Sequence, residues 1–142
     1  MPRTRLLEVL RVIAAAAARH RLTIVNVFHA GDGNLHPLIL FDPADAAETA
    51  RVHEAGEEIM RACVESAGTL SGEHGIGIEK NEMMDWVYTA EDLAAMKRVR
   101  DAFDPAGLAN PNKVFPCRAT CGEVHGPQGA GSTGAPQGGM WV

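Results

Sequence analysis

The chain of 142 residues has few of the features on which membrane, nucleic-acid-binding and disulfide-bonded proteins depend. No stretch approaches the ~20 consecutive apolar residues of a transmembrane helix, so we do not expect the chain to be transmembrane. Aromatic residues make up only 5%, the net charge is −5 and no basic stripe is present, which argues against a nucleic-acid partner. The cysteines, Cys63, Cys117 and Cys121, form no even disulfide framework, so a reducing, cytoplasmic location is the simpler expectation.

Two glycine-rich motifs contain the residues best suited to chemistry. The first, His29-Ala-Gly-Asp-Gly-Asn-Leu-His36-Pro, joins the apolar runs 23–28 and 35–41. This arrangement predicts a β-hairpin with a glycine-containing loop. Because side chains alternate along a strand, His29 and His36 can meet across the turn.

The second motif, Gly72-Glu-His-Gly-Ile-Gly77, places a carboxylate and a third imidazole among glycines. Two histidines and one carboxylate, here His29, His36 and Glu73, suit Zn²⁺, Fe²⁺ or Mn²⁺ and leave coordination positions open for a substrate oxygen. His74, next to Glu73, would then be free to act as a base. The alternative interpretation is that the two histidines only cap a hairpin and that Glu73 is a solvated loop charge.

Together with a third motif, Phe103-Asp-Pro…Asn110-Pro-Asn-Lys113, these motifs resemble the C-terminal part of the FAD-linked 2-hydroxyacid dehydrogenases. The likeness is closest to the flavin subunit of glycolate oxidase, with D-lactate dehydrogenases of the same superfamily nearby, and it covers residues 6–116. The resemblance implies that His29, His36 and Glu73 bind a divalent metal. It also implies that His74 takes the hydroxyl proton of a 2-hydroxy acid while hydride passes to the flavin.

Two positions depart from the pattern of this family. Leu38 stands where relatives acting on D-2-hydroxyglutarate have asparagine, and this difference favours a smaller substrate such as glycolate or lactate. Asn112 replaces the glycine of the usual Asn-Pro-Gly-Lys, but asparagine tolerates the left-handed conformation better than most residues, so the turn is expected to survive. No counterpart of the family's FAD-binding domain is expected before residue 6, so FAD would be bound mainly by another domain or subunit.

The hydrophobic pattern predicts the order helix, strand, strand, helix and a short strand at residues 69–71, followed by a C-terminal helix. This α+β order matches a ferredoxin-like unit without its first strand, with helices on one face of an antiparallel sheet. Both faces of the hairpin are apolar, so a partner should cover the second face. That face is expected to consist of Ile24, Phe28, Ile39 and Phe41. Its partner would be a flavin domain or another copy of the chain, which makes a homo-oligomer the expected state.

Helical periodicity gives each predicted helix one apolar face. In the first helix this face carries Leu6, Leu10, Ile13 and Ala17. In the second, which should begin with Asp42 as N-cap, it carries Val52, Ala55, Ile59 and Cys63. In the third, which begins at Thr89 and Asp92 and ends before Asp104-Pro105, it carries Leu93, Met96, Arg100 and Phe103. Residues 80–86 should form a short helical or irregular segment.

The sequence thus predicts one incomplete domain, residues 1–116, and a flexible Gly/Pro-rich tail, residues 117–142. In the tail, Cys117, Cys121 and His125 recur at four-residue spacing and could bind a metal or an iron–sulfur partner, but a fourth ligand is lacking.

The predicted function is that of the substrate- and metal-binding half of an FAD-dependent 2-hydroxyacid oxidoreductase that oxidises glycolate or D-lactate. The isolated chain should be inactive, because hydride transfer belongs to the cofactor. The alternative is a non-enzymatic metal-binding or assembly module from a split or truncated gene. A metallohydrolase that uses a bound water fits the ligand set but not the motifs.

Overall fold

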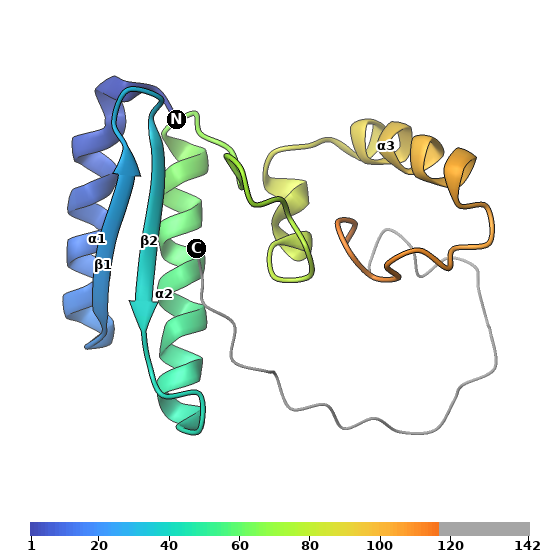
Figure 1. Cartoon of the computed structure of the whole chain (residues 1–142). Coiled ribbons are helices and arrows are strands. Elements are labelled where there is room, and N and C mark those ends of the chain that lie inside the picture. Colours follow the sequence, from blue (N-terminus) through green and yellow to red (C-terminus); the bar gives the residue numbers. More distant parts are fainter. Residues whose placement is uncertain (117–142) are drawn as a thin grey trace. The chain divides into compact units, whose positions relative to one another are not determined.

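The computed structural model describes residues 1–116, and these divide into two compact units. One unit is Met1–Thr69, and the other begins at Leu70. Along the chain the elements are η1 (Arg3–Arg5), α1 (Leu6–His20), β1 (Thr23–His29), β2 (Asn34–Leu40), α2 (Ala46–Glu65), η2 (Asn81–Trp86) and α3 (Ala90–Phe103) (Figure 1). The expectations for Cys117, Cys121, His125 and the glycine-rich tail fall outside the described residues.

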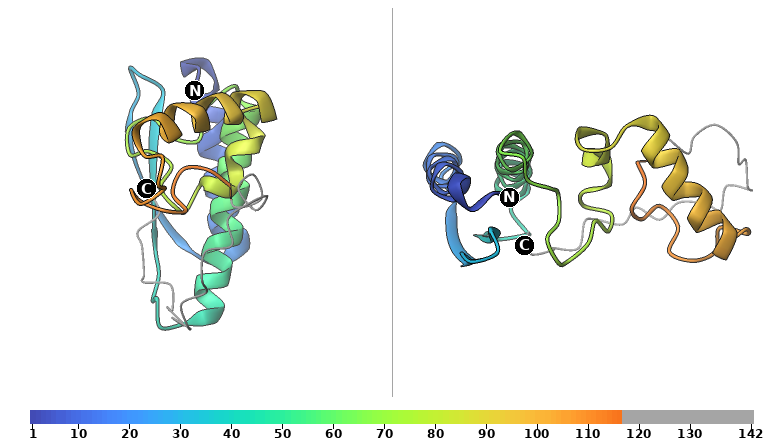
Figure 2. Two further views of the ribbon diagram at one scale, coloured as in Figure 1. Left: turned by 90° about the vertical axis from the view of Figure 1, so that its right-hand side faces the viewer. Right: turned by 90° about the horizontal axis from the view of Figure 1, so that it is seen from above.

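The first unit is a two-layer α+β structure. Strands β1 and β2 pair antiparallel, from Thr23 opposite Leu40 to His29 opposite Asn34. Helices α1 and α2 lie side by side on one face of this hairpin (Figure 2). The predicted hairpin and the predicted placement of helices on one face are therefore confirmed.

The strand predicted at residues 69–71 is absent, and the sheet in the described part of the chain has two strands. Helix α2 ends at Glu65, and Ala67 adopts a left-handed φ of 58°. The N–H of Gly68 then donates to the carbonyl of Cys63 at 2.8 Å. The left-handed Ala67 and this hydrogen bond turn the chain away from the end of α2. A three-residue segment with one buried apolar side chain, Leu70, has too little to pack to form a strand there.

The core of this unit lies between the two helices and the hairpin. Helix α1 buries Val9, Ile13 and Ala16, which pack against Ile59 and Cys63 of α2. The predicted face of α1 is thus displaced, with Ile13 the one predicted residue that is fully buried. The predicted face of α2 is confirmed, because all four of its residues are buried. Cys63 belongs to this core cluster.

The open face of the hairpin is the opposite of the one expected. Ile39 is 3% exposed, and Ile24 and Phe41 pack against the buried residues beneath the helices. The exposed apolar side chains are mainly those of Val25, Val27 and Leu40, at about half exposure. Of the four residues expected on the open face, Phe28 alone is exposed, at 43%. Because both faces are apolar in sequence, alternation alone could not show which one the helices cover.

Two helix starts test the capping predictions. Helix α2 begins three residues later than expected, because Asp45 is the N-cap and its carboxylate accepts from the N–H groups of Ala47 and Glu48. Asp42 instead accepts from Ala44 N–H, forming the turn before the helix. Helix α3 begins with the predicted Thr89 and Asp92, which form a complete capping box.

The second unit has a smaller apolar interior. Segment 80–86 contains the short 3₁₀ helix η2, and Met84 is buried there. On α3, Leu93 is buried as predicted, but Phe103 is 87% exposed, so the predicted stripe is wrong at its C-terminal end. Among residues 1–116, no helix combines the length and apolar character needed to cross a bilayer.

Candidate metal and active site

The two histidines of the first motif stand on one face of the hairpin. His36 lies directly across from Val27, and His29 lies two residues beyond Val27 on the same strand. Side chains two apart on a strand share a face, so His29 and His36 are diagonal neighbours. Their ring centroids are 5.5 Å apart with perpendicular planes. The predicted meeting of the two imidazoles across the turn is confirmed.

The turn between these histidines is fixed by backbone contacts. The N–H of Asp32 donates to the carbonyl of His29 at 3.0 Å. Gly33 has a φ of 70°, and a Cβ placed on it would collide with the carbonyl oxygen of Met1. The Met1 ammonium donates to the Gly33 carbonyl at 3.0 Å. Glycine is therefore needed at position 33 for two reasons, the positive φ and the close approach of the Met1 backbone. Gly31, in contrast, does not have a positive φ.

The second motif forms an exposed loop in the second unit. Gly75 and Gly77 have φ values of 84° and 59°, a conformation in which other residues are strained. The N–H of Gly75 donates to the Ser71 hydroxyl at 2.7 Å, which closes the loop around Glu73 and His74. Both of these side chains are exposed. The glycines thus let the backbone turn sharply on the C-terminal side of the exposed Glu73 and His74.

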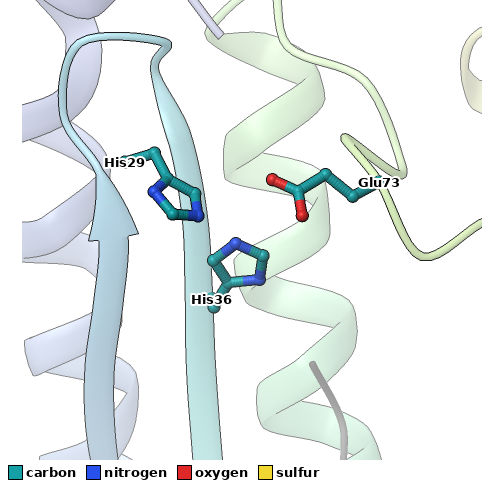
Figure 3. Close-up of side chains that lie close together, drawn as sticks. All are labelled: His29, His36 and Glu73. Carbon is teal, nitrogen blue, oxygen red and sulfur yellow. The ribbon is translucent and has the colours of Figure 1, made fainter.

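One group of potential metal ligands is found in residues 1–116, and it consists of the predicted residues. His29, His36 and Glu73 each offer one ligand atom, and these atoms all lie within 4.8 Å of one another (Figure 3). Ligand atoms around a metal at roughly 2.0–2.2 Å are closer together than this, so the group would tighten on binding. Two imidazole nitrogens and one carboxylate oxygen fit a divalent transition metal and leave positions open.

His74 does not belong to this ligand group. It follows Glu73 directly in the same loop and is exposed. A residue next to a ligand, but not itself a ligand, can exchange protons with a molecule bound at the open positions. The arrangement is thus compatible with the predicted division between metal ligands and base.

Sequence patterns missed the residues that hold the third motif in place. Arg100, expected on the apolar stripe of α3, donates to the carbonyls of Ala109, Asn110 and Lys113. Asp104 accepts from the N–H groups of Leu108 and Ala109. The bond from Ala109 lowers the pKa of Asp104 despite its slight desolvation, helped by Leu108 and Arg100. An arginine interrupting an apolar stripe just before an Asn/Pro-rich turn is the signal that could have revealed this.

Comparison with known proteins extends over nearly the whole described chain. Residues 1–114 match the family described as FAD linked oxidases, C-terminal domain. The glycolate oxidase subunit GlcD of Escherichia coli (strain K12) is 46% identical over 123 residues, which are 87% of this chain and 25% of that protein.

Two further relatives agree with this match. The glycolate oxidase subunit GlcD of Bacillus subtilis (strain 168) is 37% identical over 115 residues, 81% of this chain and 24% of that protein. The probable mitochondrial D-lactate dehydrogenase of Danio rerio is 35% identical over 115 residues, 81% of this chain and 23% of that protein. The chain spans about a quarter of the length of these curated relatives.

Proposed function

The chain belongs to the FAD linked oxidases as their C-terminal domain, and on this premise we propose that it is the substrate- and metal-binding part of an FAD-dependent 2-hydroxyacid oxidoreductase. The proposed substrates are glycolate and D-lactate. The observation that carries the proposal is the convergence of His29, His36 and Glu73, whose ligand atoms lie within 4.8 Å of one another. Single histidines on strands are common, but a two-nitrogen, one-carboxylate group beside a further imidazole suits metal-assisted oxidation of an alcohol.

The residues of this chain would divide the chemistry between them. His29, His36 and Glu73 hold the metal, and His74 accepts the hydroxyl proton of the substrate, as imidazole does in most general-base catalysis. A divalent metal held there would supply polarisation of the substrate hydroxyl, and FAD bound by a partner would supply the hydride acceptor. Because Glu73 and His74 are exposed, the partner that brings FAD also has to exclude water from this loop.

The proposed substrate class rests on the face of the hairpin that carries His29 and His36, here called the histidine face. Leu38 lies two residues from His36 on the same face, and Val25 lies across from Leu38. Neither side chain can hydrogen-bond to a second carboxylate at the far end of a substrate. A site lined by these apolar side chains discriminates against dicarboxylates, because their distal charge would be left unpaired. This supports short monocarboxylates as the substrates.

The proposed partner is an FAD-binding domain or subunit. The histidine face carries Val25, Val27 and Leu40 at about half exposure, an apolar surface that fits a protein partner. In the absence of that partner, a second copy of the chain is the proposed occupant of the same face, which would give a homo-oligomer. Light scattering at micromolar concentrations, with and without an FAD-binding domain taken from a relative, distinguishes the two.

Metal titration tests the ligand set without any flavin. Zn²⁺ or Mn²⁺ binding to the chain should weaken by more than about 100-fold in His29→Ala, His36→Ala or Glu73→Gln, since even the neighbours of ligands contribute roughly 10- to 100-fold. His53→Ala, on the exposed surface of α2, is the matched histidine control. Equal affinities in all four variants would rule the site out.

Activity measurements test the reaction itself. The isolated chain should not oxidise glycolate or D-lactate with an artificial electron acceptor, whereas a complex with an FAD-binding domain should. In that complex, His74→Ala should lower the rate by roughly 10²–10⁴-fold while leaving metal affinity unchanged. An unchanged rate would remove His74 from the mechanism.

A non-enzymatic metal-binding or assembly module is the second candidate. The observation that favours it is the ligand group itself, because His29, His36 and Glu73 could hold a metal whether or not a flavin reaction follows. Metal binding with no flavin in any purified complex would support this candidate. Hydrolytic activity with metal and without flavin would instead point to a metallohydrolase.

A further inference from the structure

Arg100 on helix α3 gathers three backbone carbonyls of the third motif. Its guanidinium donates to the carbonyl of Lys113 at 3.1 Å, of Ala109 at 2.7 Å and of Asn110 at 3.0 Å. It also stands 5.9 Å from the centre of the buried Phe115 ring. A guanidinium has five N–H donors in a rigid plane, so it can direct several carbonyls toward one point where a lysine would satisfy fewer.

The segment held in this way has an unusual backbone. Asn110, Asn112 and Val114 have φ values of 47°, 63° and 75°. Such left-handed conformations are uncommon outside glycine, and for a β-branched residue such as Val114 they are genuine outliers. They persist only where surrounding contacts fix them, and they concentrate at functional sites. The carbonyls gathered by Arg100 belong to this same segment, so Arg100 is one of those contacts.

The far end of this segment is bonded to the glycine-rich loop. The N–H of Val114 donates to the carbonyl of Gly77 at 2.8 Å. The side-chain amide of Asn81 donates to the carbonyl of Asn112 at 3.1 Å, and Asn81 is buried at the start of η2. Gly77 ends the motif that carries Glu73 and His74. A continuous path of hydrogen bonds therefore runs from Arg100 through residues 109–114 to that loop.

We propose that Arg100 is a positioning residue for the Glu73–His74 loop. By holding residues 109–114 in their strained conformation, Arg100 keeps the Val114 N–H aimed at the Gly77 carbonyl. This bond fixes the C-terminal end of a loop whose glycines would otherwise leave it mobile. The part of the inference that concerns metal binding and catalysis rests on the proposed function, whereas the control of loop order by Arg100 does not.

Hydrogen exchange of the full chain, without metal or flavin, tests the loop directly. Arg100→Ala should raise amide exchange in residues 72–80 by about tenfold or more, as expected when hydrogen bonds to a charged group are lost. Arg98→Ala, an exposed arginine on the same helix, is the matched control and should leave these amides unchanged. Arg100→Lys should restore only part of the protection, because it cannot hold three carbonyls in one plane.

A second variant covers the case in which Arg100→Ala fails to fold. Asn81→Leu removes the other hydrogen bond to residues 109–114 and should raise exchange in the same loop. Faster exchange confined to residues 109–115, with residues 72–80 unchanged in Arg100→Ala and in Asn81→Leu, would overturn the proposal.

A metal titration separates positioning from general stability. Arg100→Ala should weaken Zn²⁺ binding several-fold in the otherwise native chain, but not in a Glu73→Gln background, where the loop no longer supplies a ligand. Equal weakening in both backgrounds would contradict action through Glu73. Absence of Zn²⁺ binding to the native chain would count against the proposed function alone, because the exchange result stands apart from it.

Discussion

The two units of this chain bury different kinds of groups. In Met1–Thr69, helices α1 and α2 and the hairpin enclose most of the buried apolar side chains, among them Val9, Ile13, Val52 and Ile59. In the unit that begins at Leu70, fewer apolar residues are buried, and Arg100, Asp104 and Asn81 instead hydrogen-bond to the backbone of residues 107–114. Packing is dense and tolerates little movement, whereas such hydrogen bonds hold a particular backbone path.

The same difference separates the two motifs that carry the candidate site residues. The two histidines stand on paired strands that rest on the apolar core, so their separation is set by the sheet register. Glu73 and His74 stand in a glycine-rich loop whose conformation depends on hydrogen bonds. Apolar packing therefore fixes the histidine pair in the first unit, whereas hydrogen bonds fix the Glu73–His74 loop in the second.

The largest expected effect is on the apolar unit. Ile13→Ala removes a side chain that is fully buried between the helices, and it should lower the free energy of unfolding by about 2–5 kcal/mol. Val99→Ala, at a 61% exposed position on α3, should change it by less than about 0.5 kcal/mol. Urea denaturation monitors both, and similar losses in the two variants would break the comparison.

Removing the N-cap of α3 should lower the free energy of unfolding by a smaller amount. Thr89 accepts from Asp92 N–H and completes the capping box, so Thr89→Ala should lower the free energy of unfolding by about 1 kcal/mol. Thr89→Ser keeps the hydroxyl and should lose much less. If serine proved as harmful as alanine by the same denaturation assay, the cap would not be what stabilises this helix.

Asp104 should make the folding stability of the second unit sensitive to acid. Hydrogen bonds from Ala109 and Leu108 hold the folded pKa of Asp104 below its ordinary value of 3.8, in spite of slight desolvation. A lowered folded pKa means that the ionised carboxylate stabilises the fold above pH 3.8 and that this contribution is lost as the pH falls through the folded pKa.

Asp104→Asn should therefore be less stable than the native chain near neutrality and equal to it in acid. The measurement is the unfolding midpoint in denaturant across the acid range, with Asp85→Asn as an exposed control. A stability difference that stayed constant with pH would show that the hydrogen bonds do not depend on the charge of Asp104.

Removal of a surface ion pair should have the smallest effect on stability, and this effect should be similar in the two units. Arg5 pairs with Glu8 at 2.6 Å in the first unit, and Lys97 pairs with Asp101 at 2.9 Å in the second, all on exposed helix surfaces. Arg5→Gln and Lys97→Gln should each cost about 0.2–0.5 kcal/mol at low salt and nothing measurable in 1 M salt. A larger cost in one unit would mean that surface charge, and not the interior, distinguishes the two.

Much of this organisation could be predicted from local patterns. Periodicity and short-range chemistry account for the hairpin, the approach of His29 to His36, the buried face of α2 and the capping box at Thr89. These features depend on residues near one another in the sequence. The three motifs by themselves also indicate the family that residues 1–114 match.

The features that were missed depend on contacts that no local pattern encodes. Whether helices cover Ile24 or Val25 depends on tertiary packing, since both faces of the hairpin are apolar. Asp42 and Asp45 are the same residue type and equally suitable as N-caps, so the N-cap position of Asp45 depends on the geometry of the turn before α2. Arg100 acts through carbonyls whose direction depends on three left-handed residues, and this direction cannot be read from residue types.

The exposed face of β1 has a consequence for anyone who handles this chain by itself. Residues 23–28, Thr-Ile-Val-Asn-Val-Phe, contain no charge, proline or glycine, and within the described residues β1 pairs with β2 alone. Short uncharged segments of high β-propensity with an unpaired edge are the templates on which cross-β fibrils grow. A purified preparation of the chain alone should therefore be lost first to fibril growth seeded at β1, and Val25→Lys, at an exposed position, should delay that loss.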